Sequence, residues 1–145
     1  LLQKGLKQEY GIFELPLFEY NEFGKPSLTR YPAIHFNMSH CKRAVVCLLA
    51  NHPVGVDVEE ITPFDPDVAR YVLNSKEYER MVSSDNPAEE FTILWTMKES
   101  LIKLTGVGID DELLPDLLQD ILKYNFQTTV NREKGYVTTT CSSIM

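Results

Sequence analysis

The chain of 145 residues is 43% hydrophobic and 24% charged, a composition typical of one globular domain with its own hydrophobic core. Its net charge of −7 argues against general nucleic-acid binding, because phosphate neutralisation supplies most of that affinity. No run approaches the ~18 apolar residues of a membrane-spanning helix, and the three cysteines form no CxxC pair. We therefore expect a cytoplasmic protein without a nucleic-acid or membrane partner.

The first third of the chain predicts one helix and a long loop. Residues 1–10 read as the end of a helix that Gly11 stops. The loop that follows contains a turn at residues 21–26, where Gly24 permits a positive φ. This turn should present Lys25 on a stiff support.

Three strands are expected next, at residues 34–37, 44–50 and 54–59. The second is apolar and β-branched, and the third alternates strictly between apolar and other residues. Residues 51–53 (NHP) lie between these two strands and predict a hairpin turn that pairs them.

The remaining chain predicts helices followed by a closing hairpin. Two short helices are expected at residues 65–73 and 76–82, with Ser75 capping the second. A long helix should span residues 88–104, and two strands should pair across the turn 131–135. These last strands are expected at residues 121–130 and 136–141.

The strand at residues 54–59 carries two acids on one face. Side chains two positions apart on a strand point the same way, so Asp57 and Glu59 should project together. Two adjacent carboxylates repel unless a cation lies between them, and Mg²⁺ prefers carboxylate, water and phosphate oxygens. A solvated strand face is the alternative for an isolated acid pair.

The long helix carries a polar group beside the single tryptophan of the chain. Trp95, Glu99 and Lys103 follow one another at four-residue spacing and therefore share a face. A salt bridge between Glu99 and Lys103 next to a core tryptophan is the simpler interpretation. A site that handles charge is the other interpretation.

Residues 36–40 (FNMSH) leave the first of the three strands and run into Lys42 and Arg43. Ser39 and His40 could donate hydrogen bonds to a phosphate there, although a solvated polar loop fits equally well. Adjacent serine and histidine do not form a hydrolase dyad, and the chain has no GxSxG elbow.

Taken together and in order, these motifs resemble the 4′-phosphopantetheinyl transferase superfamily, in particular the surfactin-synthetase-activating type. The matching segments are residues 24–26 (GKP), 36–40 (FNMSH), 55–59 (GVDVE) and 95–103 (WTMKESLIK), with Gly106 and Gly108. The resemblance covers about residues 20–110 and extends weakly to the last predicted strand.

The resemblance implies an α+β fold of two similar halves, each a long helix on a small antiparallel sheet. Residues 1–50 would be the remainder of the N-terminal half and residues 51–145 the C-terminal half of a single transferase domain. Family members carry a further N-terminal stretch, so the first half is expected to be incomplete in a chain truncated at its N-terminus. The family type implies a monomer, and a truncated chain could instead form a dimer.

The resemblance also implies a site. Asp57, Glu59 and Glu99 would hold Mg²⁺, for which Mn²⁺ is the alternative. Lys103 would contact the pyrophosphate of coenzyme A and share catalysis with Asp57 and Glu99. The coenzyme would be bound by Lys25, Ser39, His40 and Lys103, and Glu77 would lie near the reacting centre.

The implied reaction is that of a holo-[acyl-carrier-protein] synthase. The 4′-phosphopantetheine group of coenzyme A would pass to a serine of an apo acyl or peptidyl carrier protein, with release of 3′,5′-ADP. Glu99 would accept the serine proton directly or through water, because an unperturbed lysine such as Lys98 is protonated at neutral pH. The alternatives are a non-catalytic relative that binds coenzyme A or a carrier protein, and an unrelated Mg²⁺-dependent phosphoryl-transfer site. No P-loop supports the second.

Overall fold

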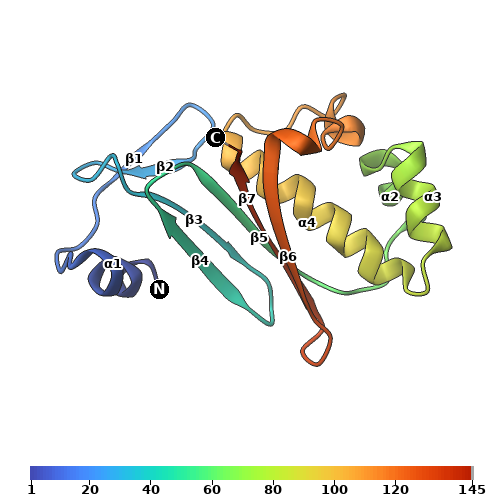
Figure 1. Cartoon of the computed structure of the whole chain (residues 1–145), viewed down its shortest axis with the longest axis horizontal. Helices are drawn as coiled ribbons and strands as arrows, with labels where there is room; N and C mark the ends of the chain where they lie inside the picture. Colours follow the sequence, from blue (N-terminus) through green and yellow to red (C-terminus); the bar gives the residue numbers. More distant parts are fainter. Residues whose placement is uncertain (145) are drawn as a thin grey trace.

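Three small antiparallel sheets occupy the middle of the computed structural model, which describes residues 1–144 (Figure 1). The first pairs β1 (Phe18–Tyr20) with β2 (Pro26–Leu28), and the second pairs β3 (His35–His40) with β4 (Val45–Ala50). The third has the order β5 (Val54–Glu60), β7 (Tyr136–Ser143), β6 (Tyr124–Asn131).

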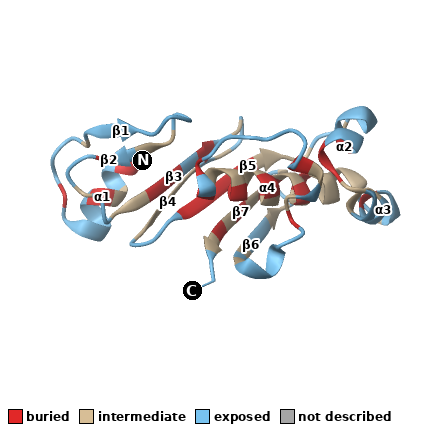
Figure 2. Cartoon of the chain, turned by 90° about the horizontal axis from the view of Figure 1, so that it is seen from above, coloured by how far each residue is buried: buried red, intermediate tan, exposed pale blue. Residues whose placement is uncertain are grey.

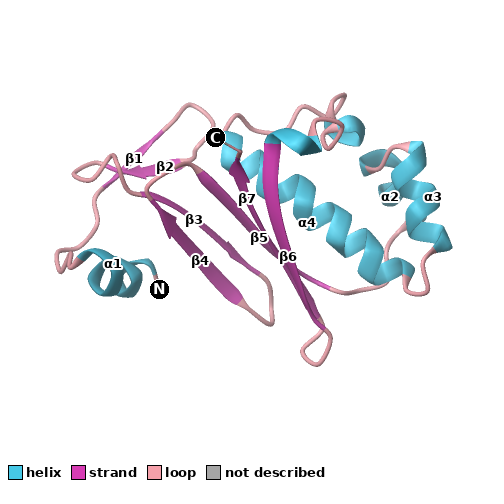
Figure 3. Cartoon of the chain, in the orientation of Figure 1, coloured by secondary structure: helices cyan, strands magenta, loops and turns pink. Residues whose placement is uncertain are grey.

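Residues 1–144 also form four α-helices, with α1 at one end of the molecule and α2 and α3 at the other (Figure 3). They are α1 (Leu2–Tyr10), α2 (Pro66–Val72), α3 (Ser75–Ser83) and α4 (Pro87–Thr105), with short 3₁₀ helices η1 (Leu114–Asp116) and η2 (Ile121–Lys123). The predicted α+β class is confirmed. The division into two halves at residue 50 stays a prediction. None of the helices within residues 1–144 combines the length and hydropathy of a membrane span.

The predicted helix ends are confirmed by their glycines. Gly11 follows α1 with φ 67°, and Gly106 follows α4 with φ 66°. In this left-handed conformation a glycine carries no Cβ penalty, and its N–H reaches back to a carbonyl of the last turn. Gly106 donates to Ile102 in this way, and it lies against the side chain of Lys25.

The hairpin predicted at residues 51–53 is wrong. β4 pairs with β3, where Ser39 lies opposite Val46, and β5 pairs with β7, where Asp57 lies opposite Thr139. The NHP segment therefore only connects two different sheets. An apolar, β-branched strand fits any neighbour with a matching pattern, so its sequence does not select its partner.

The N-cap predicted for the second short helix is also wrong. Asn74 caps α3, because its side chain accepts from the N–H of Glu77 while Glu77 accepts from the N–H of Asn74. Ser75 is the first helical residue. The structure further adds β1 and β2 to the predicted loop, and extends β3 through Ser39 and His40.

α4 packs across β5 and β7, where buried residues gather (Figure 2), and the larger core extends from α4 to α2, α3 and η1. A Cβ on Gly55 would lie only 1.9 Å from the carbonyl oxygen of Ser100, so only glycine permits this close approach of strand and helix. A smaller core joins α1 to β2 and β3 through Leu2, Leu6, Leu28 and Phe36. The close contact of β5 with α4 is what brings the predicted acids of the two elements together.

Candidate functional site

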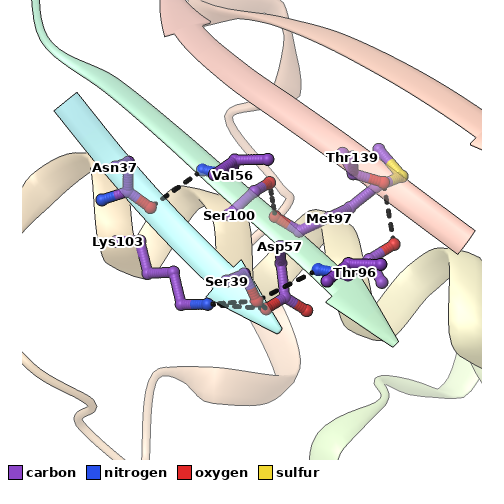
Figure 4. Close-up of polar contacts among 10 residues, drawn as sticks. Asn37, Ser39, Val56, Asp57, Thr96, Met97, Ser100, Lys103 and Thr139 are labelled. Carbon is purple, nitrogen blue, oxygen red and sulfur yellow. Dashed lines mark hydrogen bonds and ion pairs between the residues drawn. The ribbon is translucent and has the colours of Figure 1, made fainter. Parts of the chain in front are cut away.

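Asp57 lies at the centre of the site, between β5 and α4 (Figure 4). Its side chain is 2% exposed, and its Oδ1 accepts a hydrogen bond from Lys103 Nζ at 2.7 Å. Ser39 Oγ donates to the same oxygen at 2.9 Å. The other oxygen, Oδ2, is buried and has no hydrogen-bond partner. A buried carboxylate oxygen without a partner costs free energy unless a cation or donor completes it.

β3 lies beside the free edge of β5 and contacts it through side chains (Figure 4). Asn37 Oδ1 accepts from the N–H of Val56 at 3.1 Å, and Ser39 Oγ accepts from the N–H of Val58 at 3.2 Å. These two bonds take the place of a backbone ladder between β3 and β5. We call Asn37, Ser39, Val56 and Val58 the β3–β5 seam.

Glu59 and Glu99 complete the acidic group around Asp57. Burial, followed by repulsion from Asp57, raises the pKa of Glu99, while Lys103 opposes the shift. Burial also raises the pKa of Glu59, with repulsion from Asp57 and then Glu99 as the next causes. Three carboxylates thus share one region with Lys103 as the cation bound to Asp57.

The residues present suit a hard divalent cation. Carboxylate oxygens are the ligands that Mg²⁺ and Mn²⁺ prefer, and Asp57 Oδ2 is an acceptor with no other partner. Within residues 1–144, no three His, Cys, Asp or Glu side chains are gathered closely enough to hold an ion as they stand. Mutual repulsion keeps like charges apart when no cation lies between them. Asp57, Glu59 and Glu99 as metal ligands therefore stay a prediction.

A pocket of about 340 Å³ opens beside Lys103. Lys25, Phe36, Asn37 and Ile102 line it together with Lys103. It combines cationic side chains with apolar walls, which suits a ligand that carries both phosphates and apolar parts. The pocket adjoins Asp57, because Lys103 lines the pocket and also forms an ion pair with the Asp57 carboxylate.

The loop that carries Lys25 is fixed to the end of α4. Lys25 Nζ donates to the carbonyl of Leu104 at 2.8 Å, and Asn21 Nδ2 donates to that of Gly106 at 2.8 Å. A cation at a helix C-terminus is favourable there. Burial lowers the pKa of Lys25. Lys25 therefore lines the pocket with a half-buried side chain, and its ammonium binds the C-terminal end of α4. Its role as a coenzyme ligand stays a prediction.

His40 ends β3 on the exposed surface, one residue after buried Ser39. Of the two cations that follow, Arg43 is directed to Glu60 at 3.5 Å, and the backbone N–H of Lys42 donates to the same carboxylate at 3.1 Å. Two cations were predicted beside His40. Glu60 binds one of them, Arg43, and so neutralises part of this positive charge.

Buried Lys98 and partly buried Glu77 form a separate ion pair that the sequence did not reveal. Lys98 Nζ lies 2.7 Å from Glu77 Oε2, and the lysine side chain is fully buried. The same nitrogen donates to the carbonyls of Val72, Leu114 and Pro115. Lys98 thus binds Glu77, and through its contacts it joins α4 to α2, α3 and η1. The available signal was the position of Lys98 on the helix face of Leu94 and Leu101, which are both buried.

Replacing Glu59 by glutamine should stabilise the metal-free protein at neutral pH. Because its folded-state pKa is raised above the ordinary 4.5, the folded chain binds the proton more tightly than the unfolded chain. The free energy of unfolding therefore falls as pH rises above about 4.5, and glutamine removes this loss. Urea unfolding in EDTA should show a gain at about pH 7.5 and almost none at about pH 4.5. An equal gain from exposed Glu133→Gln would contradict the explanation.

A known protein family and curated proteins match the part of the chain that contains this site. The family described as the 4′-phosphopantetheinyl transferase superfamily matches residues 53–141, from just before β5 into β7. The 4′-phosphopantetheinyl transferase psf-1 of Bacillus pumilus is 42% identical over 112 residues, which cover 75% of this chain and 48% of that protein.

Two further relatives agree. The 4′-phosphopantetheinyl transferase gsp of Aneurinibacillus migulanus is 42% identical, and Sfp of Bacillus subtilis (strain 168) is 36% identical, each over 112 residues. Each match covers 75% of this chain, with 46% and 50% of the respective relatives. The chain thus spans about half the length of these curated relatives. The matched residues include β5 and α4 with their acids, and the chain belongs to the 4′-phosphopantetheinyl transferase superfamily.

Proposed function

We propose that this chain is part of an enzyme that transfers the 4′-phosphopantetheine group of coenzyme A to a serine of an apo acyl or peptidyl carrier protein. The observation that carries the proposal is the contact of Asp57 on β5 with Lys103 on α4, beside a pocket that Lys103 and Lys25 line. The names of the relatives support the same activity.

Coenzyme A would bind along the pocket with its phosphates toward Lys103. Lys25 and Lys103 give the pocket positive charge, and Phe36 and Ile102 give it apolar surface. His40 lies beyond Ser39 on β3 and would add a donor for a phosphate. Ser39 belongs to the same predicted group, and its hydroxyl is already bound to Asp57 and Lys103.

Asp57, Glu59 and Glu99 would hold Mg²⁺ or Mn²⁺, with Asp57 Oδ2 as the acceptor that is ready for it. The bound ion would supply positive charge to the pyrophosphate oxygens of coenzyme A. Lys103 would then exchange its contact with Asp57 for one with the same pyrophosphate. This exchange needs only a side-chain movement, because Lys103 is 29% exposed and already borders the pocket.

The proposed transfer is a single phosphoryl displacement. The carrier serine oxygen forms a bond to the β-phosphorus of coenzyme A, and the bond from that phosphorus to the bridging oxygen breaks. The electron pair leaves with 3′,5′-ADP, and the serine proton passes to Glu99 directly or through water. Lys103 stabilises the negative charge that develops on the phosphate oxygens. Lys98 takes no part, since its ammonium is held by Glu77 and three carbonyls.

A mass spectrum of an apo acyl carrier protein tests the proposal. Incubation with this chain, coenzyme A and Mg²⁺ should add about 340 Da to the carrier, the mass expected for phosphopantetheine, and EDTA should prevent the gain. No gain with several acyl and peptidyl carriers, while coenzyme A still binds, would favour a non-catalytic relative. Monomeric state and cytoplasmic location stay part of the proposal.

A further inference from the structure

We propose that Ser39 is a positioning residue that orients the Asp57 carboxylate toward the metal, and that it does not bind the coenzyme. This inference rests on the proposed function, and it assigns Ser39 a different role from the one that the family resemblance implies. It follows from the contacts of one hydroxyl group and from the state of the two oxygens of Asp57.

The hydroxyl of Ser39 has no hydrogen left to donate to a ligand. A serine hydroxyl offers one hydrogen and two acceptor lone pairs. Its hydrogen goes to Asp57 Oδ1 at 2.9 Å, and its oxygen accepts from the N–H of Val58 at 3.2 Å and from Lys103 Nζ at 3.0 Å. The residue is also 8% exposed. Donation to a phosphate would therefore break the bond to Asp57.

The same contacts distinguish the two oxygens of Asp57. The terminal torsion of an aspartate has a broad energy profile, so the carboxylate needs partners to fix its rotation. Oδ1 receives both Ser39 and Lys103, whereas Oδ2 is buried without any hydrogen-bond partner. Ser39 and Lys103 together saturate Oδ1, which leaves Oδ2 as the available ligand atom. Partners of this kind orient metal ligands and raise metal affinity.

Ser39 can do this because the β3–β5 seam holds its own position. Its backbone pairs with Val46 of β4, and two residues earlier Asn37 binds the N–H of Val56 on the next strand. Side chains two positions apart on β3 share a face, so both point toward β5 (Figure 4). Asn37 supports the seam without a hydrogen bond to Asp57, which makes it the matched control for Ser39.

The test measures binding of Mn²⁺ and of coenzyme A separately, on the whole chain. Mn²⁺ affinity is read by electron paramagnetic resonance in the absence of coenzyme A, and coenzyme A affinity by calorimetry in EDTA. Ser39→Ala should weaken Mn²⁺ binding about 10- to 100-fold and leave coenzyme A binding unchanged. Asn37→Ala should leave the Mn²⁺ affinity close to that of the wild type. Ser39→Thr, which keeps the hydroxyl, should restore it.

The other outcomes separate this inference from the proposed function. Weaker coenzyme A binding by Ser39→Ala in EDTA, with Mn²⁺ binding intact, would make Ser39 a coenzyme ligand and overturn the inference alone. Equal losses of Mn²⁺ affinity in Ser39→Ala and Asn37→Ala would reduce Ser39 to a structural part of the seam. A wild-type chain that binds no Mn²⁺ would overturn the metal site and the inference with it. If Ser39→Ala does not fold, Ser39→Cys, a near-isosteric weak donor, should show the same selective loss.

Discussion

Glu99→Gln should lower the rate of phosphopantetheine transfer by about 10²- to 10⁴-fold. Glutamine keeps the size of the side chain but can neither accept the serine proton nor supply negative charge to a metal ion. Burial, followed by repulsion from Asp57, raises the pKa of Glu99 on α4. The rate is measured as the carrier mass shift over time at saturating coenzyme A and Mg²⁺.

Stability distinguishes a lost catalytic group from a damaged fold in this variant. The raised pKa means that the ionised Glu99 carboxylate destabilises the folded, metal-free chain at neutral pH. Glu99→Gln should therefore unfold at a urea concentration equal to or above that of the wild type in EDTA. Exposed Glu133→Gln is the control and should keep full transfer activity. Retained transfer by Glu99→Gln would remove Glu99 from the mechanism.

Lys98→Met should lower the free energy of unfolding by about 3–5 kcal/mol. The lysine is fully buried, and its removal leaves the Glu77 carboxylate without its cation and takes one donor from each of the carbonyls of Val72, Leu114 and Pro115. Because these acceptors lie on α2, α3 and η1, the substitution should loosen all three from α4. Urea unfolding followed by circular dichroism measures the change.

A double variant tests whether the loss comes from the stranded carboxylate. Lys98→Met combined with Glu77→Gln should recover part of the stability, because it removes the unpaired charge that the single variant leaves buried. Lys76→Met, an exposed lysine on α3, should change the free energy of unfolding by less than about 0.5 kcal/mol. A loss below about 1 kcal/mol for Lys98→Met would show that water replaces the buried ammonium.

The elements with strong local signals could be predicted from the sequence. α4 runs from Pro87 to Thr105, against an expected 88–104, because its apolar period and Gly106 are properties of neighbouring residues. Strand β5 and the two closing strands were expected from local residue patterns and turn signals. Residues 121–123, expected as strand, form η2 instead. The acids of β5 and α4 could be identified in the same way, as parts of ordered motifs.

Strand pairing and side-chain partners could not be predicted in this way. The sequence placed a hairpin at residues 51–53, whereas β4 pairs with β3 and β5 with β7. Ser39 was assigned to a phosphate, and its neighbours along the chain give no sign of its bonds to Asp57, Val58 and Lys103. Those partners come from β5 and α4, 18 to 64 positions away.

The sequence by itself determined the family motifs, the long helix with its ends, and the residues with the chemistry for metal and phosphate. These follow from local backbone preferences and from residue type, which need no knowledge of distant contacts. Only the tertiary structure decided that Ser39 and Lys103 share one oxygen of Asp57, and that Lys98 binds Glu77. The reason is physical: a buried polar group takes whichever partner the packing of β3, β5 and α4 brings within about 3 Å, irrespective of separation along the chain.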